Sequence, residues 1–344
     1  MRIFLVSLVS IVGLFITSCG DKNKDPNTEI PLVDSTLSKL NSPELKAINA
    51  ELGKNPSNPD LYYKRGQLYL SNKDFTAAIG DAKRAIKIDS SKGDYFILLC
   101  DGYFFSNQTR LAKETLEYCL KLNPASTEAN LKLGEMYFYV RKYQESINYI
   151  NNALKVNQTL SKGYYLKGMC YKESGDTAKA VSSFETAVEQ DNNYYAAYME
   201  LGLIFANKKN PLALEYFNNA LRIDPKSSEI YYDMGKFYQD MNKPKLATET
   251  YKKLLSFNPK EKNAIYNLGA IELYFNKNID AAKKCFSDAI FTDPNYAEAY
   301  FGRGVCYDQQ KDYKNAKADY EMAVQLKPNY EHAIENLNRL EGKK

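Results

Sequence analysis

A glycine recurs about every 34 residues along most of this chain. It stands at Gly66, Gly134, Gly168, Gly202, Gly235, Gly269 and Gly304. Cys100 occupies the one missing place, so successive places are separated by 34, 34, 34, 34, 33, 34 and 35 residues. A fixed period of this length indicates a series of repeated structural units, each stacked on its neighbours.

Large side chains return together with the glycine. An aromatic residue follows it by three positions in most units, as Tyr69 and Phe205 do, and another precedes it by four, as Tyr62 and Tyr198 do. Residues at these spacings share one face of an α-helix. The pattern therefore predicts one helix around each of these places.

A second helix is predicted after a short polar turn. Small residues stand twelve and nineteen positions after the glycine, as Ala180 and Ala187 do, with a larger apolar residue such as Phe184 between them. Five units end near a proline, for example Pro225 and Pro294, which halts one helix and starts the next. A glycine inside a helix costs about 1 kcal/mol relative to alanine, so its recurrence needs a packing reason. We expect the small residues of the two helices to face one another, so that each repeat forms a helical hairpin.

This period and pattern resemble the tetratricopeptide repeat family, with tyrosine or phenylalanine in the place of the usual tryptophan. The resemblance covers residues 59–330 and weakens at Cys100 and before Ala282, where one extra residue falls. It implies an all-α fold, a right-handed α-solenoid of about eight helical hairpins. The expected units are 59–92, 93–126, 127–160, 161–194, 195–227, 228–261, 262–296 and 297–330. Because terminal repeats need polar-backed caps, we expect capping helices in residues 42–58, starting at Ser42, and in residues 331–344.

The start of the chain has the composition of a secretory leader. Residues 3–16 are almost wholly apolar, and this run is shorter than the roughly 20 residues that span a bilayer. The sequence Ile16-Thr17-Ser18-Cys19 resembles the bacterial lipobox, which implies cleavage before Cys19 and acyl chains on that residue. The alternative is an ordinary secretory leader with an incidental cysteine. We expect a lipoprotein signal peptide in 1–18, a lipidated flexible tether in 19–41, and a location in the bacterial cell envelope, at the periplasmic or surface face of the outer membrane.

The composition argues against most enzymes and against nucleic-acid binding. The formal net charge is +4, which is no polyanion-binding signature. His332 is the single histidine, and the chain contains no Gly-rich phosphate loop, Cys-x-x-Cys pair or His-Glu-x-x-His helix. We therefore expect no catalytic residue, no cofactor and no metal site.

Five cysteines follow Cys19, and all fall at or near predicted core positions. They are Cys100, Cys119, Cys170, Cys285 and Cys306. Disulfides between Cys285 and Cys306 or between Cys100 and Cys119 are alternatives that the sequence leaves open. Because disulfide geometry is narrow, buried and unpaired cysteines are the preferred interpretation.

The first helix of each unit is the expected site of partner binding. In the family this helix lines the concave face, and the resemblance implies contacts from its second, fifth, ninth, twelfth and thirteenth positions. The fifth position is apolar or aromatic in every unit: Tyr63, Ile97, Leu131, Tyr165, Met199, Tyr232, Tyr266 and Phe301. The twelfth and thirteenth positions add Phe104, Tyr139 and Tyr274. Such a row favours a groove for extended peptides or partner helices.

Alternatives to this groove and its ligand remain open. Tight curvature could bury the fifth-position side chains against adjacent first helices. Acidic residues such as Asp60, Asp101 and Glu298 border the same face, which favours a basic or neutral apolar peptide. The leading hypothesis is a non-catalytic, membrane-anchored scaffold for protein or peptide partners. The alternatives are an envelope lipoprotein that binds glycans through its tyrosines and an accessory lipoprotein of an outer-membrane secretion or assembly machine.

Overall fold

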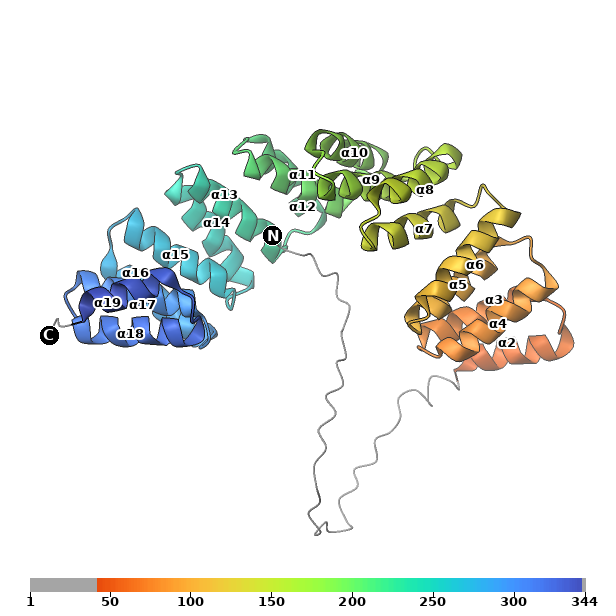
Figure 1. Ribbon diagram of the computed structural model, residues 1–344, viewed down its shortest axis with the longest axis horizontal. Coiled ribbons are helices and arrows are strands. Elements are labelled where there is room, and N and C mark those ends of the chain that lie inside the picture. Colours follow the sequence, from red (N-terminus) through yellow and green to blue (C-terminus); the bar gives the residue numbers. More distant parts are fainter. Residues whose placement is uncertain (1–41, 342–344) are drawn as a thin grey trace, which may run out of the picture.

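The computed structural model describes residues 42–341, which form eighteen α-helices and no β-strand. The helices follow one another along a curved arch (Figure 1). The predicted all-α solenoid is confirmed. The predicted signal peptide, Cys19 and the tether lie outside the described residues.

Sixteen of these helices form eight consecutive hairpins, each joined by a short turn. The first four hairpins are α3 (Pro59–Ser71) with α4 (Phe75–Ile88), α5 (Gly93–Phe105) with α6 (Thr109–Leu122), α7 (Thr127–Tyr139) with α8 (Tyr143–Val156), and α9 (Ser161–Glu173) with α10 (Thr177–Gln190). The last four are α11 (Tyr195–Asn207) with α12 (Leu212–Ile223), α13 (Ser228–Asp240) with α14 (Pro244–Phe257), α15 (Lys262–Tyr274) with α16 (Ile279–Thr292), and α17 (Ala297–Gln309) with α18 (Tyr313–Leu326).

A single helix flanks the hairpins at each end. Helix α2 (Pro43–Lys54) begins after Ser42, whose Oγ accepts a hydrogen bond of 3.2 Å from the backbone N–H of Leu45. It packs on α3, while α19 (Glu331–Leu340) packs on α18. Both helices bury one face, through residues such as Leu45 and Leu340, and leave the other to solvent.

Seven of the eight hairpins carry the recurring glycine, and in the last five its partner is larger than the sequence predicts. In the last five units the glycine faces a buried ring of the second helix: Phe184, Phe217, Tyr251, Phe286 or Tyr320. A Cβ placed on Gly202, for example, would lie 2.5 Å from Cδ1 of Phe217. The expectation that small residues alone face one another is therefore corrected, because glycine makes room for a ring.

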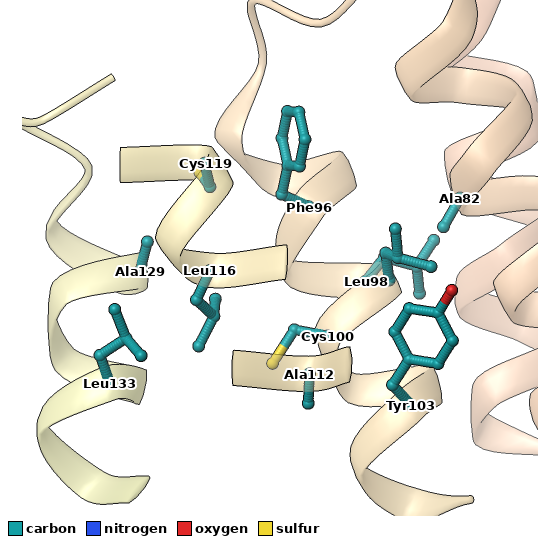
Figure 2. Close-up of a cluster of buried hydrophobic side chains, with 11 residues drawn as sticks. Ala82, Phe96, Leu98, Cys100, Tyr103, Ala112, Leu116, Cys119, Ala129 and Leu133 are labelled. Atoms are coloured by element: carbon teal, nitrogen blue, oxygen red, sulfur yellow. The ribbon is translucent and has the colours of Figure 1, made fainter. Parts of the chain in front are cut away.

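The second unit has Cys100 in place of the glycine, and the residue opposite it is smaller than the rings of the last five units. Cys100 lies in a cluster with Ala112 and Leu116, and no ring fills the second-helix place opposite it (Figure 2). Leu116 stands sixteen residues after Cys100, the spacing that separates Gly168 from Phe184. In this unit a cysteine in place of the glycine thus accompanies a leucine in place of the ring.

The cysteines serve as core residues. The five cysteines between residues 42 and 341 are unpaired, and four of them are buried. Burial raises the pKa of the Cys100 thiol to about 12, so this thiol stays protonated. In the same span of the chain, no helix combines the length and the apolar character needed to cross a bilayer.

Candidate peptide-binding face

The first helices of neighbouring units form a row and pack against one another at five of the seven junctions between units. Direct packing joins α3 to α5, α5 to α7, α7 to α9, α11 to α13 and α15 to α17. The second helix of each unit packs on its own first helix, on the other side of this row. The row therefore presents one face built from the same helix positions in each unit, as a repeat array requires.

The fifth-position aromatic residues of this face are held between two other rings. The Tyr266 ring centroid lies 5.4 Å from that of Phe286 and 5.5 Å from that of Tyr296. Tyr165 repeats this arrangement with Phe184 and Tyr194, and Phe301 repeats it with Tyr320 and Tyr330. Each of these rings is partly buried, so packing fixes it while a portion reaches the surface.

Two of the predicted groove residues do not reach the surface. Leu131 is 2% exposed and Met199 is 5% exposed, because both are packed in the core between helices. Ile97 is partly buried against the cluster of the second unit. The fifth-position row is therefore interrupted in the third and fifth units, where the side chain is buried.

The remaining predicted groove residues contribute to the surface to different degrees. Tyr63 is partly buried beside the Tyr95 ring, and its hydroxyl accepts a hydrogen bond of 2.8 Å from Nε2 of Gln67. Tyr232 packs against Tyr251 and Phe104 is partly buried. Tyr139 and Tyr274 are exposed at the ends of their helices.

A dense group of tyrosines lies in units 6 to 8. We name it the C-terminal tyrosine cluster, and it consists of Tyr232, Tyr266, Tyr274, Tyr296 and Tyr330. Burial, together with the nearby phenols of Tyr274 and Tyr232 and the carboxylate of Glu298, raises the pKa of Tyr266 to about 12. Burial also raises the pKa of Tyr296 and of Tyr330. These phenols are therefore neutral at physiological pH and offer hydroxyl groups beside apolar ring carbons.

Lysines neutralise much of the acidic border of this face. Asp60 pairs with Lys92 at 2.8 Å, and Asp101 pairs with Lys132 at 2.7 Å. Further pairs join Glu135 to Lys162, Glu200 to Lys172 and Glu298 to Lys327. Three of the five pairs join one unit to the next, and all five carboxylates already have a cation. Of the basic and neutral apolar peptides that the sequence favours, a neutral segment fits this partly neutralised face better.

The sequence interpretation missed three residues of this face. Tyr194, Tyr296 and Tyr330 each stand directly before the first residue of a following helix, outside the helix positions considered for binding. Their recurrence at the same place in the fourth, seventh and eighth units was the available signal. The sequence alone does not show which residues these tyrosines contact, because those contacts depend on how neighbouring helices pack.

Comparisons with known proteins agree with this architecture. Family models described as tetratricopeptide repeat match residues 45–92, 165–228, 204–271 and 297–339. A DnaJ homolog subfamily C member 7 homolog of Dictyostelium discoideum is 29% identical over 201 residues, covering 53% of this chain and 37% of the relative. Hsp70-Hsp90 organizing protein 3 of Arabidopsis thaliana is 25% identical over 138 residues, covering 40% of this chain and 25% of the relative. The chain thus spans well under half the length of these curated relatives.

Solved structures show the same fold at lower sequence identity. A structure titled for the functional characterisation of Pseudomonas aeruginosa pilF aligns with a TM-score of 0.53 and 16% identity, covering 62% of this chain and 96% of that one. A tetratricopeptide repeat protein from Parabacteroides merdae aligns with a TM-score of 0.50 and 18% identity, covering 73% of this chain and 99% of that one. At these identities the likeness concerns the fold alone.

Proposed function

Because the chain is built from tetratricopeptide repeats, we propose that it is a non-catalytic scaffold that holds uncharged, extended peptide segments of partner proteins on its concave face. The observation that supports this proposal is the C-terminal tyrosine cluster. The rings of Tyr266, Tyr296 and Tyr330 are held in place by other rings, and burial raises the pKa of each of these three phenols. The acidic neighbour Glu298 is paired with Lys327. Rigid aromatic residues contribute contact area at low entropic cost, and extended, proline-rich segments dock in aromatic-lined grooves.

The names of the curated relatives are compatible with a scaffold role. One of them is an Hsp70-Hsp90 organizing protein, and another is anaphase-promoting complex subunit 3 of Schizosaccharomyces pombe, 27% identical over 140 residues. Both names describe proteins that work in assemblies. The ligands of those proteins are not assigned to this chain, because a fold shared by many functions does not fix the partner.

A photo-crosslinking residue at Tyr274 tests the binding face. Tyr274 is 54% exposed at the end of α15, so p-benzoylphenylalanine there is expected to leave the fold intact and to capture a small set of partner proteins in producing cells. The control is Phe291, a 90% exposed aromatic residue of α16 in the same unit, which belongs to the second helix. We expect no specific crosslinks from that position.

A second variant blocks the face without removing a packed ring. Ala270 lies one turn from both Tyr266 and Tyr274 on the same side of α15, so Ala270→Arg places a long charged side chain between them. Crosslinks from Tyr274 are expected to disappear in this background. Identical crosslinked species from positions 274 and 291, or unchanged crosslinks in the Ala270→Arg variant, would contradict the proposed binding face.

We further propose that acyl chains on Cys19 attach the scaffold to an envelope membrane, at the outer membrane. The support is the leader with its lipobox-like end. An alkyne-tagged fatty acid supplied to producing cells is expected to label the wild-type chain and to give no label with Cys19→Ser. Cys285→Ser is the matched control and should keep the full label, because Cys285 lies in the array. Label retained by Cys19→Ser would remove the anchor from the proposal.

The glycan-binding alternative draws less support from the geometry. Carbohydrates stack on open ring faces, whereas Tyr165, Tyr266 and Phe301 each contact two other rings. Tyr139 and Tyr274 keep more of their surface free. Glycan binding and membership of an outer-membrane secretion or assembly machine stay predictions from the sequence.

A further inference from the structure

The two edges of the solenoid differ in charge. One edge is formed by the turns inside the hairpins, and we name it the hairpin-turn edge. These turns hold eight Lys or Arg and three Asp, a net charge of +5. The turns between successive hairpins form the opposite edge and hold three Lys and five acidic residues, a net charge of −2. The positive charge of the chain is therefore concentrated on one edge.

Backbone conformation does not explain the cations on the hairpin-turn edge. Each hairpin turn contains one residue with positive φ, a conformation that glycine adopts freely and asparagine adopts more readily than other residues. Five of the eight positions nevertheless carry a cation: Lys73 (φ 63°), Arg141 (60°), Lys209 (52°), Lys277 (56°) and Lys311 (61°). All five are exposed, and none forms an ion pair with another residue of the described range 42–341. Their charges are thus available to a partner.

Exposed apolar side chains accompany these cations in the first three units. Phe105 is 55% exposed, and its ring stacks on Phe75 of the preceding unit with centroids 5.8 Å apart. Tyr139, the last residue of α7, is 71% exposed, and Val140 beside it in the hairpin turn is 63% exposed. Exposed apolar groups that occur next to unpaired cations mark an interaction surface.

We propose that the hairpin-turn edge of the first three units rests on the surface of an anionic phospholipid membrane. The residues that would contact it are Lys73, Phe105, Tyr139, Val140, Arg141 and Lys142. Aromatic rings partition into the headgroup region, and each cation near an anionic membrane surface contributes about 1 kcal/mol. A protein partner fits less well, because lysine is depleted in protein–protein interfaces.

The position of this edge along the chain agrees with a membrane contact. Only α2 separates the three units from residues 19–41, which carry the proposed lipid anchor, so in part this inference rests on the proposed membrane attachment. Acyl chains would hold these units near the bilayer, and the edge would then fix their orientation. Weak contacts become effective when a tether raises the local concentration.

Single tryptophan reporters test the contact, because the natural chain contains no tryptophan. The full chain is reconstituted with phosphatidylcholine–phosphatidylglycerol vesicles that carry bromine-labelled acyl chains. The emission of the Val140→Trp protein is expected to shift to shorter wavelength and to be quenched. The matched control is Val156→Trp, which replaces another exposed valine of the same unit at the end of α8, on the opposite edge. Its emission is expected to stay unshifted and unquenched.

Charge reversal separates the edge from the anchor. Adding Arg141→Glu and Lys142→Glu to the Val140→Trp protein is expected to abolish the quenching, as is replacing phosphatidylglycerol with phosphatidylcholine. Flotation of the chain with the vesicles reports the acyl anchor independently of the tryptophan signal. A chain that floats while positions 140 and 156 give equal quenching retains the anchor and overturns the edge contact.

Two further outcomes complete the test. If circular dichroism shows that Val140→Trp is not folded, Phe105→Trp replaces it as the reporter with the same expected result. If the reporter becomes shielded only when envelope proteins are added to the vesicles, the edge is a protein-binding surface, and the membrane proposal is wrong.

Discussion

Replacing Phe217 with alanine is expected to lower the free energy of unfolding by about 3 to 5 kcal/mol, the range found when a buried phenylalanine is truncated. The ring is fully buried on α12 and occupies the space that Gly202 leaves on α11. Each unit of a solenoid is stabilised by its neighbours. We therefore expect the middle units of the variant to unfold at a lower urea concentration than those of the wild-type chain. Urea denaturation followed by far-ultraviolet circular dichroism measures it.

A second substitution tests whether Gly202 and Phe217 act as a pair. Adding Gly202→Leu to Phe217→Ala places a side chain in the vacated space, so the double variant should be more stable than the sum of the two single effects by about 1 kcal/mol or more. Phe291→Ala is the control for loss of an aromatic residue, since Phe291 is almost fully exposed and its removal should change stability by less than about 0.5 kcal/mol. Strict additivity, or equal losses at positions 217 and 291, would contradict the assigned pairing.

The relation between Gly202 and Phe217 also shows how far the sequence determines the fold. The period of the glycines and the spacing of Ala180, Phe184 and Ala187 predict helices in pairs, because these patterns depend only on geometry within one helix. Which side chain faces the glycine depends on the rotation of one helix about its axis relative to the other. That rotation places Phe184 opposite Gly168, although small residues stand on either side of it.

The binding face was harder to predict, because it depends on how units are placed relative to one another. Leu131 and Met199 occupy the same helix position as Tyr266, yet they are buried and Tyr266 keeps a surface. The Lys327–Glu298 pair joins residues 29 apart, and Tyr266 on α15 contacts Tyr296, which directly precedes α17. The pattern within one repeat carries no information about the superhelical rotation that creates these contacts.

Substitution of Gly235 with alanine is expected to destabilise the chain by about 1 to 3 kcal/mol, as overpacking of a dense core does. A Cβ at this position would overlap the ring of Tyr251 and lie 2.7 Å from its Cζ. That ring cannot easily move, because its hydroxyl donates a hydrogen bond of 2.6 Å to Oε1 of Gln239 and accepts one of 3.0 Å from Nδ2 of Asn267. The gain in helix propensity, about 1 kcal/mol, offsets only part of the clash.

Gly80 provides the same substitution in open space and should change stability in the opposite direction. It lies inside α4, is exposed, and a Cβ there would meet no atom within 4 Å. Gly80→Ala is therefore expected to stabilise the chain by about 0.5 to 1 kcal/mol, since alanine restricts the unfolded chain and favours the helix. Denaturation midpoints of the two variants measure the contrast. If both substitutions stabilise, the recurring glycines are not required for close helix packing, and the close approach of Tyr251 to Gly235 has no energetic consequence.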